Sequence, residues 1–155
     1  MPLDRPWIGA HIPHAGGMCL LDEVLSWDAT HIECRSATHR AADNPLRAHG
    51  RLGSACGVEY AAQAMAVHGA LVTGRTSAPT AGYLAGLRAV VLHVERLDDI
   101  QADLLISGER INGDDTTVIY QFAVHDAARP LVTGRATIVL DAAALARGGG
   151  AQLTP

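Results

Sequence analysis

The sequence SACGVEYAAQAMAV occupies residues 54–67 and dictates the architecture that we expect for the rest of the chain. Its alanines and Met65 favour a helix, and Gly69 is placed to end that helix. Apolar side chains occur on nearly every side of it, whereas a surface helix would show a polar face. The stretch therefore predicts a buried helix with other elements wrapped around it.

Strand-like runs dominate the sequence on both sides of this helix. Residues 18–27 and 31–37 are predicted to form a hairpin joined through residues 28–30. After a loop at residues 73–80, rich in Gly, Ser and Pro, we expect strands at residues 84–97, 102–112, 116–125 and 131–140. Short turns join most of these neighbours, which predicts an antiparallel sheet. One helix with about six strands is an α+β domain.

Length and composition limit the classes of protein that need to be considered. We place a single domain at residues 1–145 and a flexible Gly-rich tail at 146–155 of the 155 residues. Hydrophobic residues make up 48% and charged residues 18%, which excludes a disordered chain. The net charge of −4 argues against nucleic acid as a partner. Neither a membrane span nor a signal peptide is visible, so we expect a cytoplasmic protein.

Cysteine and histidine do not form a recognisable metal or redox motif. The three cysteines, Cys19, Cys34 and Cys56, are odd in number, and their spacing forms no CxxC motif. The spacing of the eight histidines forms neither HxxxH nor HExxH. The glycine fingerprints of nucleotide-binding loops and the GxSxG elbow of serine hydrolases are also missing from the sequence. We therefore expect neither a metal nor a cofactor.

Two polar residues, Glu59 and Gln63, stand one turn apart on the predicted buried helix. A buried carboxyl group is usually paired or functional, and its desolvation raises the pKa towards the range of a general acid. Two interpretations follow from the helix alone. Either Glu59 transfers protons in an active site, or it pairs with an arginine while Gln63 satisfies backbone groups.

Two further motifs connect the sequence to a known family. Residues 12–14 read IPH, and Met18-x-Leu20-Leu21-Asp22-x-Val24 follows them. They resemble the Leu/Ile-Pro-His-Arg turn and the Leu-Leu-Val-Asp-x-Val strand of the hotdog-fold β-hydroxyacyl-(acyl carrier protein) dehydratases. Residues 59–63, EYAAQ, are similar to Glu-Ala-Met-Ala-Gln on that family's central helix. The order of elements agrees over residues 7–140, and the resemblance implies a hotdog fold, an antiparallel sheet wrapped around one central helix.

The resemblance also implies a reaction, the elimination of water from a 3-hydroxyacyl thioester. In the family a histidine removes the α-proton, and the helix carboxyl group protonates the departing hydroxyl. Backbone N–H groups at the helix start polarise the thioester carbonyl. By position, Glu59 matches the catalytic acid and Gln63 the helix glutamine. The positions expected to bind substrate are Ser54, Ala55, Cys56 and Gly57 at the helix start, Gln63 on the helix, and His14 at the mouth of the cleft.

The sequence departs from the family at the catalytic histidine. The family histidine precedes the carboxyl by fourteen residues, in Gly-His-Phe-Pro followed by Met-Pro-Gly, and that position holds Pro45 here. His49, ten residues before Glu59, is the candidate replacement for the catalytic base. The chain thus resembles a divergent branch of the family, in which some subunits pair with an active dehydratase in polyene-type lipid synthesis.

These observations predict a 3-hydroxyacyl-ACP dehydratase-like protein of fatty acid or polyene/polyketide-type lipid biosynthesis. Two alternatives remain open, a non-catalytic hotdog partner of an active dehydratase and an acyl thioesterase, which shares the fold and the helix carboxylate. Because the family's histidine and carboxyl come from different subunits, we expect a homodimer or a heterodimer with another hotdog chain. The expected substrate is an acyl thioester on acyl carrier protein or coenzyme A, without nucleic acid or membrane partners.

Overall fold

The computed structural model of the protein describes residues 2–12, 16–74, 83–114 and 116–139. In chain order its elements are α1 Arg5–His11, η1 Gly16–Met18, β1 Glu23–Trp27, β2 His31–Ser36, η2 Thr38–Arg40, η3 Ser54–Cys56, α2 Gly57–Thr73, β3 Tyr83–Leu92, β4 Leu104–Gly113, β5 Thr117–His125 and β6 Pro130–Val139. Most of the predicted loop at 73–80, the domain boundary at 145 and the tail at 146–155 lie outside the described residues.

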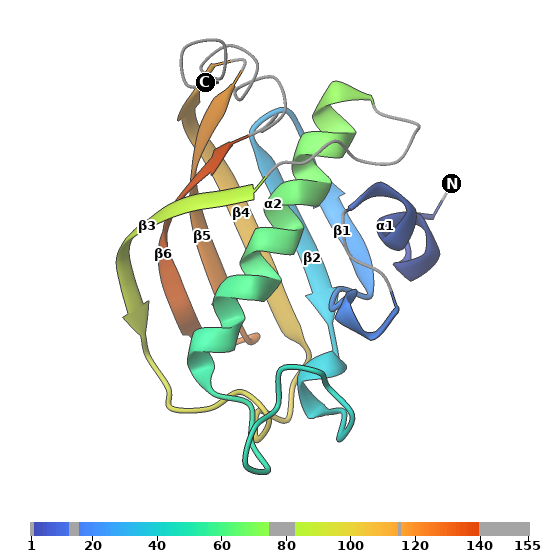
Figure 1. The fold of residues 1–155 in the computed structure, drawn as a ribbon, viewed down its shortest axis with the longest axis vertical. Helices are drawn as coiled ribbons and strands as arrows, with labels where there is room; N and C mark the ends of the chain where they lie inside the picture. Colours follow the sequence, from blue (N-terminus) through green and yellow to red (C-terminus); the bar gives the residue numbers. More distant parts are fainter. Residues whose placement is uncertain (1, 13–15, 75–82, 115, 140–155) are drawn as a thin grey trace, which may run out of the picture.

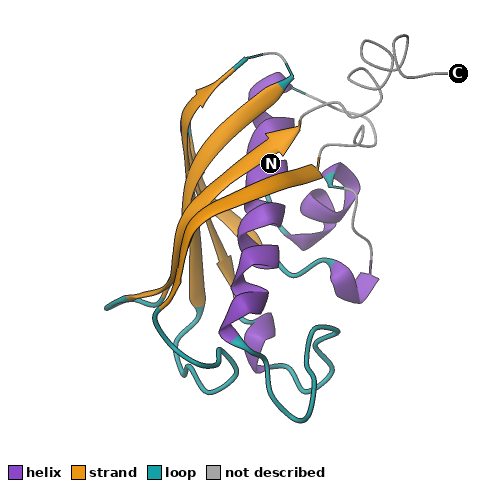
Figure 2. Ribbon diagram, turned by 60° about the vertical axis from the view of Figure 1, so that its left-hand side comes forward, coloured by secondary structure: helices purple, strands orange, loops and turns teal. Residues whose placement is uncertain are grey.

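The strands form one antiparallel sheet in the order β1-β2-β4-β5-β6-β3. β3 follows α2 in the chain and pairs with β6, so β1 and β3 are the two edge strands. Figures 1 and 2 show this sheet curving along one side of α2, which lies on its concave face. A curved antiparallel sheet with one long helix on its concave face is the hotdog arrangement, so the predicted fold class is confirmed.

Alternation of side chains explains why the long strands form where the sequence placed them. β5 directs Val118, Tyr120, Phe122 and Val124 into the core, where each is at most 2% exposed. The residues between them face away from the helix, as the period of two in a strand requires. β6 shows the same alternation over most of its length. The core therefore lies between the concave face of the sheet and the buried side of α2.

The helix α2 is covered by the sheet on one side only. Its buried residues include Tyr60, Ala64 and Met65, which belong to the core cluster. On another side, a line of half-exposed small or polar residues runs along the helix, and we call it the open stripe: Glu59, Ala62, Ala66 and Gly69. The predicted central buried helix is confirmed, and the open stripe is the part of its surface that the sheet of this chain does not cover.

The bounds of α2 also differ from the prediction. The residues Ser54–Cys56 form a separate 3-10 turn ahead of the helix. At the other end, Gly69 does not terminate the helix, which continues through Thr73. Gly74 is the residue that adopts the left-handed conformation, with φ +67, and its N–H donates to the carbonyls of Ala70 and Leu71. A glycine ends a helix where the backbone reverses, and that condition holds at Gly74 and not at Gly69.

The N-terminal segment departs furthest from the expectation. α1 was not predicted; Asp4 caps it by accepting a hydrogen bond from the Trp7 N–H. The strand predicted from residue 18 begins only at Glu23, because side chains bind the backbone of residues 18–20 where a neighbouring strand would otherwise do so. The hairpin itself is confirmed, with Asp28 closing its turn by accepting from the N–H groups of Thr30 and His31.

Candidate active site

Glu59 lies in the first turn of α2, at the N-terminal end of the open stripe. Its side chain is half-buried and takes part in an interaction within the protein. Glu59 is thus fixed to a rigid element and is half-exposed on the open stripe.

The backbone N–H groups at the helix start are largely engaged within the chain. The Ser54 N–H donates to the carbonyl of Glu95 at 3.0 Å, and the Cys56 N–H donates to the carbonyl of Gly53 at 3.0 Å. The Gly57 N–H is directed to the carbonyls of Ser54 and Ala55. Ser54 is buried, whereas Ala55 is exposed. Of the four residues predicted to bind the thioester carbonyl, Ala55 therefore presents itself most openly to solvent.

Gly57 has a packing role that the sequence did not predict. A Cβ atom at this position would lie 2.9 Å from Cγ2 of Val132 and 3.5 Å from Cγ2 of Val124. Both valines are fully buried strand residues. The lack of a side chain at Gly57 thus lets the start of α2 sit directly on β5 and β6, and this contact fixes the position of Glu59 two residues later.

Gln63 anchors the N-terminal segment to the helix one turn after Glu59. Its Oε1 accepts from the Leu20 N–H at 2.9 Å, and its Nε2 donates to the Met18 carbonyl at 2.7 Å. The side chain is fully buried, so the whole amide is used within the protein. The Gln63 amide therefore satisfies backbone groups, and its contribution to a site is to position residues 18–20.

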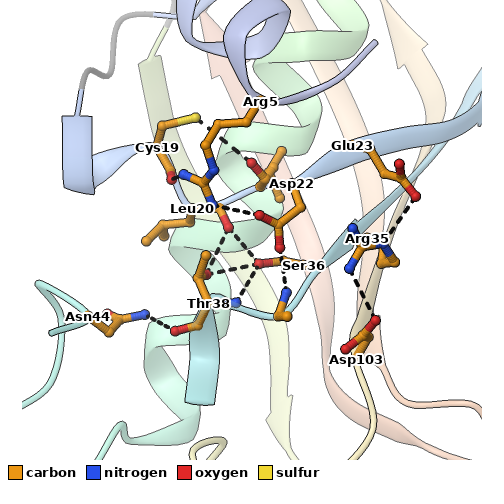
Figure 3. A network of polar contacts seen from close by, with 12 residues as sticks. Arg5, Cys19, Leu20, Asp22, Glu23, Arg35, Ser36, Thr38, Asn44 and Asp103 are labelled. Atoms are coloured by element: carbon orange, nitrogen blue, oxygen red, sulfur yellow. Dashed lines mark hydrogen bonds and ion pairs between the residues drawn. The ribbon is translucent and has the colours of Figure 1, made fainter. Parts of the chain in front are cut away.

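A polar network holds the same segment from its other side (Figure 3). Asp22 accepts from Nη2 of Arg5 at 2.7 Å and from the Ala37 N–H at 2.7 Å, and Arg5 also donates to the Cys19 carbonyl. The Leu20 carbonyl accepts from the hydroxyls of Ser36 and Thr38. The motif that carried the resemblance, residues 18–24, is therefore the connection between α1, β2 and α2.

Tyr60 extends this network into the helix. Its hydroxyl lies 2.8 Å from Oγ1 of Thr38 and accepts from Nδ2 of Asn44 at 3.0 Å. Burial raises the pKa of Tyr60, and the hydrogen bonds from Thr38 and Asn44 lower it by less. The phenol is thus a neutral structural group. It ties the loop after η2 to the first turns of α2, next to Glu59.

His49, the candidate base, lies at the tip of a tight turn. The Ala48 and Arg51 backbones pair on either side of it, and His49 and Gly50 both adopt left-handed angles, with φ +55 and +77. The His49 side chain is exposed. The loop that carries it is tied to the rest of the protein through Asp98, which accepts from the Leu52 N–H at 2.9 Å.

Arg96 completes the anchoring of this loop. Its guanidinium donates to both carboxylate oxygens of Asp98 and holds the pKa of that carboxyl group well below its usual range. The loop between η2 and η3, teal in Figure 1, lies at the end of the molecule where α2 begins. The structure thus places the His49 loop at the same end as Glu59 and gives His49 the backbone of a turn residue. His14, the remaining candidate, lies outside the described residues.

One buried histidine, His68, was not among the candidate site residues of the sequence analysis. His68, on α2, is 1% exposed, and its Nε2 lies 2.8 Å from the Asp28 carbonyl. Since a carbonyl only accepts, Nε2 carries the proton, and Nδ1 accepts from the Tyr120 hydroxyl at 2.6 Å. Burial lowers the pKa of His68 and raises that of Tyr120 to about 12. The pattern that could have revealed His68 is its place on the apolar side of the helix.

The part of the chain that the structure describes contains no cluster of three or more His, Cys, Asp or Glu able to hold a metal ion. The three cysteines are free, and burial raises the pKa of Cys34 to about 12, which keeps its thiol protonated. Among the described helices, none has the length and hydropathy needed to cross a bilayer.

Comparisons with known proteins agree with the motifs. The ApeP-like family, described as ApeP dehydratase, matches residues 6–146. The dehydratase heterocomplex ApeI:P from Xenorhabdus doucetiae contains a chain that is 25% identical, with a TM-score of 0.77 and 93% of each chain covered. No curated protein sequence matches this chain.

Other solved structures share the fold at lower identity. Thioesterase superfamily member 2 from zebrafish has a TM-score of 0.62 at 14% identity, covering 88% of this chain and 94% of its own. A mutant thioesterase from Pseudomonas aeruginosa has a TM-score of 0.51 at 16% identity, covering 76% and 78%. At these identities the likeness concerns the fold alone.

Proposed function

This chain belongs to the ApeP-like dehydratase family, and we propose that it supplies the proton donor of a two-chain hotdog dehydratase acting on a 3-hydroxyacyl thioester. The observation that carries the proposal is the position of Glu59, in the first turn of α2 on the open stripe. A carboxyl group on the side of the helix that its own sheet leaves open is available to a site shared with a second chain.

The proposed reaction breaks two bonds of the substrate. A base removes the proton from the α-carbon, and its electron pair forms the α,β double bond while the hydroxyl leaves the β-carbon. The protonated Glu59 carboxyl donates its proton to that hydroxyl, which departs as water. The base ends the reaction with one proton more and Glu59 with one fewer, so the site is restored when the base releases its proton and Glu59 takes one up.

The base is proposed to come from the second chain. The resemblance implies that the histidine and the carboxyl of each site belong to different subunits, and this sequence holds Pro45 where the family has its histidine. Pairing with a histidine-bearing hotdog chain would therefore build one complete site, with Glu59 opposite the partner's histidine. The likeness of this chain, over 93% of its length, to one chain of the heterocomplex ApeI:P supports such an assembly.

The edge strand β3 supports the same assembly. Its exposed large apolar side chains are Leu87, Val90, Val91 and Leu92, at 43%, 36%, 48% and 47% exposure. Sheet edges present unpaired N–H and C=O groups, and an apolar edge of this kind is a template for another strand. Pairing of β3 with the corresponding edge of a second hotdog chain would bury these side chains and bring that chain towards the open stripe.

The opposite edge is less available. The Val24 N–H of β1 donates to the Leu3 carbonyl at 2.8 Å, and Asp4 forms a bridge with Glu23. The segment ahead of α1 therefore occupies the first half of the β1 edge. This asymmetry favours β3 as the strand that receives the partner.

A reconstitution experiment tests the proposal. The chain is incubated with a 3-hydroxyacyl thioester of coenzyme A, alone and after co-purification with a hotdog dehydratase chain that carries the Gly-His-Phe-Pro motif. Enoyl thioester and free thiol are quantified by mass spectrometry. We expect dehydration only from the pair, and a loss of about 10²–10⁴-fold when the pair contains Glu59→Gln. Glu33→Gln, the same chemical change on the outer side of β2, serves as the matched control and should leave the rate unchanged.

The outcomes separate the alternatives. A pair that is equally active with Glu59→Gln assigns this chain the non-catalytic role and overturns the proposed proton transfer. Dehydration by the purified chain alone would overturn the need for a second chain. Release of free thiol without enoyl product would identify a thioesterase. If Glu59 instead forms a structural ion pair, Glu59→Gln will lower the melting temperature, which is measured on the same samples.

A further inference from the structure

A row of polar residues crosses the outer face of the sheet, away from α2. Backbone pairing places His31 of β2 opposite Glu109 of β4, and Glu109 opposite Gln121 of β5. Gln121 lies opposite Arg135 of β6, which in turn lies opposite Arg88 of β3. All five side chains are exposed. The row thus ends at the open edge with two arginines on directly opposed positions.

No acidic side chain among the described residues pairs with either arginine. Glu109, the acidic member of the row, pairs with Nε2 of His31 at 3.0 Å and is separated from Arg135 by Gln121. Within the described ranges, neither Arg88 nor Arg135 takes part in an ion pair. Like charges directly opposed on neighbouring strands destabilise a sheet, so this arrangement has a cost in the isolated chain.

We propose that Arg88 and Arg135 disfavour pairing of β3 with a second copy of this chain and select a hotdog partner whose edge strand carries carboxylates on its outer face. The inference rests on the edge pairing in the proposed function. It adds the chemistry by which the correct second chain is recognised, a combination of attraction to one partner and repulsion of another.

The position of Arg88 is what makes self-pairing unfavourable. It lies at the middle of β3, Tyr83–Leu92, so an antiparallel pair of two β3 strands centred on each other brings both Arg88 residues to the symmetry axis. Directly or diagonally opposed residues on one face are about 5–8 Å apart. Four guanidinium groups, from Arg88 and Arg135 of each copy, would then lie in one row. Carboxylates on the partner's strand would convert the same row into alternating attractive contacts.

A mixing experiment tests this with the chain itself. Wild type and Arg88→Glu are mixed in equal amounts, and native mass spectrometry, which separates the species by mass, measures the two homodimers and the mixed dimer. We expect the mixed dimer to associate about fivefold or more tightly than the mean of the two homodimers. Raising the salt concentration should reduce this preference and strengthen the wild-type homodimer, because screening weakens both effects.

The matched control is Arg51→Glu, the same charge change in the exposed turn far along the chain from β3. Its mixture with wild type should give dimers in chance proportion, and circular dichroism verifies that both variants are folded. Chance proportions with Arg88→Glu, or an equal preference with Arg51→Glu, would overturn the charge selection alone. If no mixture forms a dimer at any salt concentration, β3 does not pair with a second copy of this chain even when the charges are complementary, and the charge selection is overturned; the proposed function is decided separately by the reconstituted pair.

Discussion

At the scale of single residues, the backbone of His49 distinguishes a turn residue from a catalytic base. Its φ of +55 is a conformation that glycine adopts without strain. Replacing His49 by Gly therefore preserves the turn while removing the imidazole. We expect His49→Gly to raise the free energy of unfolding by up to about 1 kcal/mol, measured by urea denaturation. We also expect the reconstituted pair that contains His49→Gly to keep its rate, whereas loss of a general base would lower that rate by about 10²–10⁴-fold.

His49→Ala provides the control for this prediction, because it removes the imidazole but keeps a side chain at the strained angle. It should be less stable than His49→Gly and equally active. Loss of activity in both variants, with the fold intact, would show instead that His49 is the base and that the loop brings it to the substrate.

His68 makes the stability of the protein sensitive to pH. Its pKa in the folded protein lies below the ordinary value of 6.5, chiefly because it is buried. As the pH falls through about 6.5, the unfolded chain takes up a proton that folded His68 resists, so stability present above that pH is lost towards the folded pKa. We expect the free energy of unfolding to fall by on the order of 1 kcal/mol between about pH 7.5 and about pH 5.5.

His68→Phe tests the assignment to this residue. The variant loses the hydrogen bonds to Tyr120 and Asp28 and should be about 1–3 kcal/mol less stable at neutral pH. Its stability should nevertheless depend less on pH than that of the wild type. Some dependence remains, because burial also lowers the pKa of His39. An unchanged pH dependence in His68→Phe would assign the effect elsewhere.

At the scale of elements, two glycines of α2 offer an internal comparison. A Cβ at Gly57 meets the buried Val132 at 2.9 Å, whereas a Cβ at Gly69 meets nothing within 4 Å. We expect Gly57→Ala to cost about 1–3 kcal/mol through overpacking. Gly69→Ala should stabilise the isolated chain by about 0.5–1 kcal/mol through helix propensity. Thermal unfolding of both variants checks the prediction, and equal effects would mean that α2 does not rest on β6 as described.

The elements also show how far a sequence can lead. β4, β5 and β6 were predictable because alternating side chains and short turns mark a strand locally, whereas the strand predicted at residues 84–97 ends already at Leu92. α1 and the start of β1 were not, because their form depends on contacts distant in the chain. Residues 18–20 have strand-like side chains, but the Gln63 amide and two hydroxyls bind their backbone instead. A local sequence pattern cannot indicate a hydrogen-bond partner that lies about forty residues away in the chain.

The candidate site divides in the same way. Glu59 was predictable because a carboxyl group stands out on an otherwise apolar helix. The half-exposure of the open stripe was not, because it depends on how much of α2 one sheet can cover. The packing role of Gly57 could not be inferred either, since it depends on Val124 and Val132, which come from strands far along the chain.

At the scale of the whole molecule, the two edges of the sheet should respond differently to the same change. Leu92 on β3 and Leu25 on β1 are both 47% exposed. Burying a leucine is worth about 1.5–3 kcal/mol, so Leu92→Ser should weaken association with the second hotdog chain by roughly tenfold or more. Leu25→Ser should leave it unchanged. Calorimetric titration measures both, and a greater effect of Leu25→Ser would move the interface to β1.

The unequal edges also give the molecule a valence. A protein whose sheet has two unpaired edges can bind another copy at each edge, and repeated pairing of this kind forms a fibre. Here Leu3 and Asp4 pair with the start of β1. The chain therefore offers mainly one edge, β3, to another strand, and no further chain is added once β3 is paired. Those two residues therefore act as a chain terminator, and their removal would convert a component that forms pairs into one capable of open-ended polymerisation.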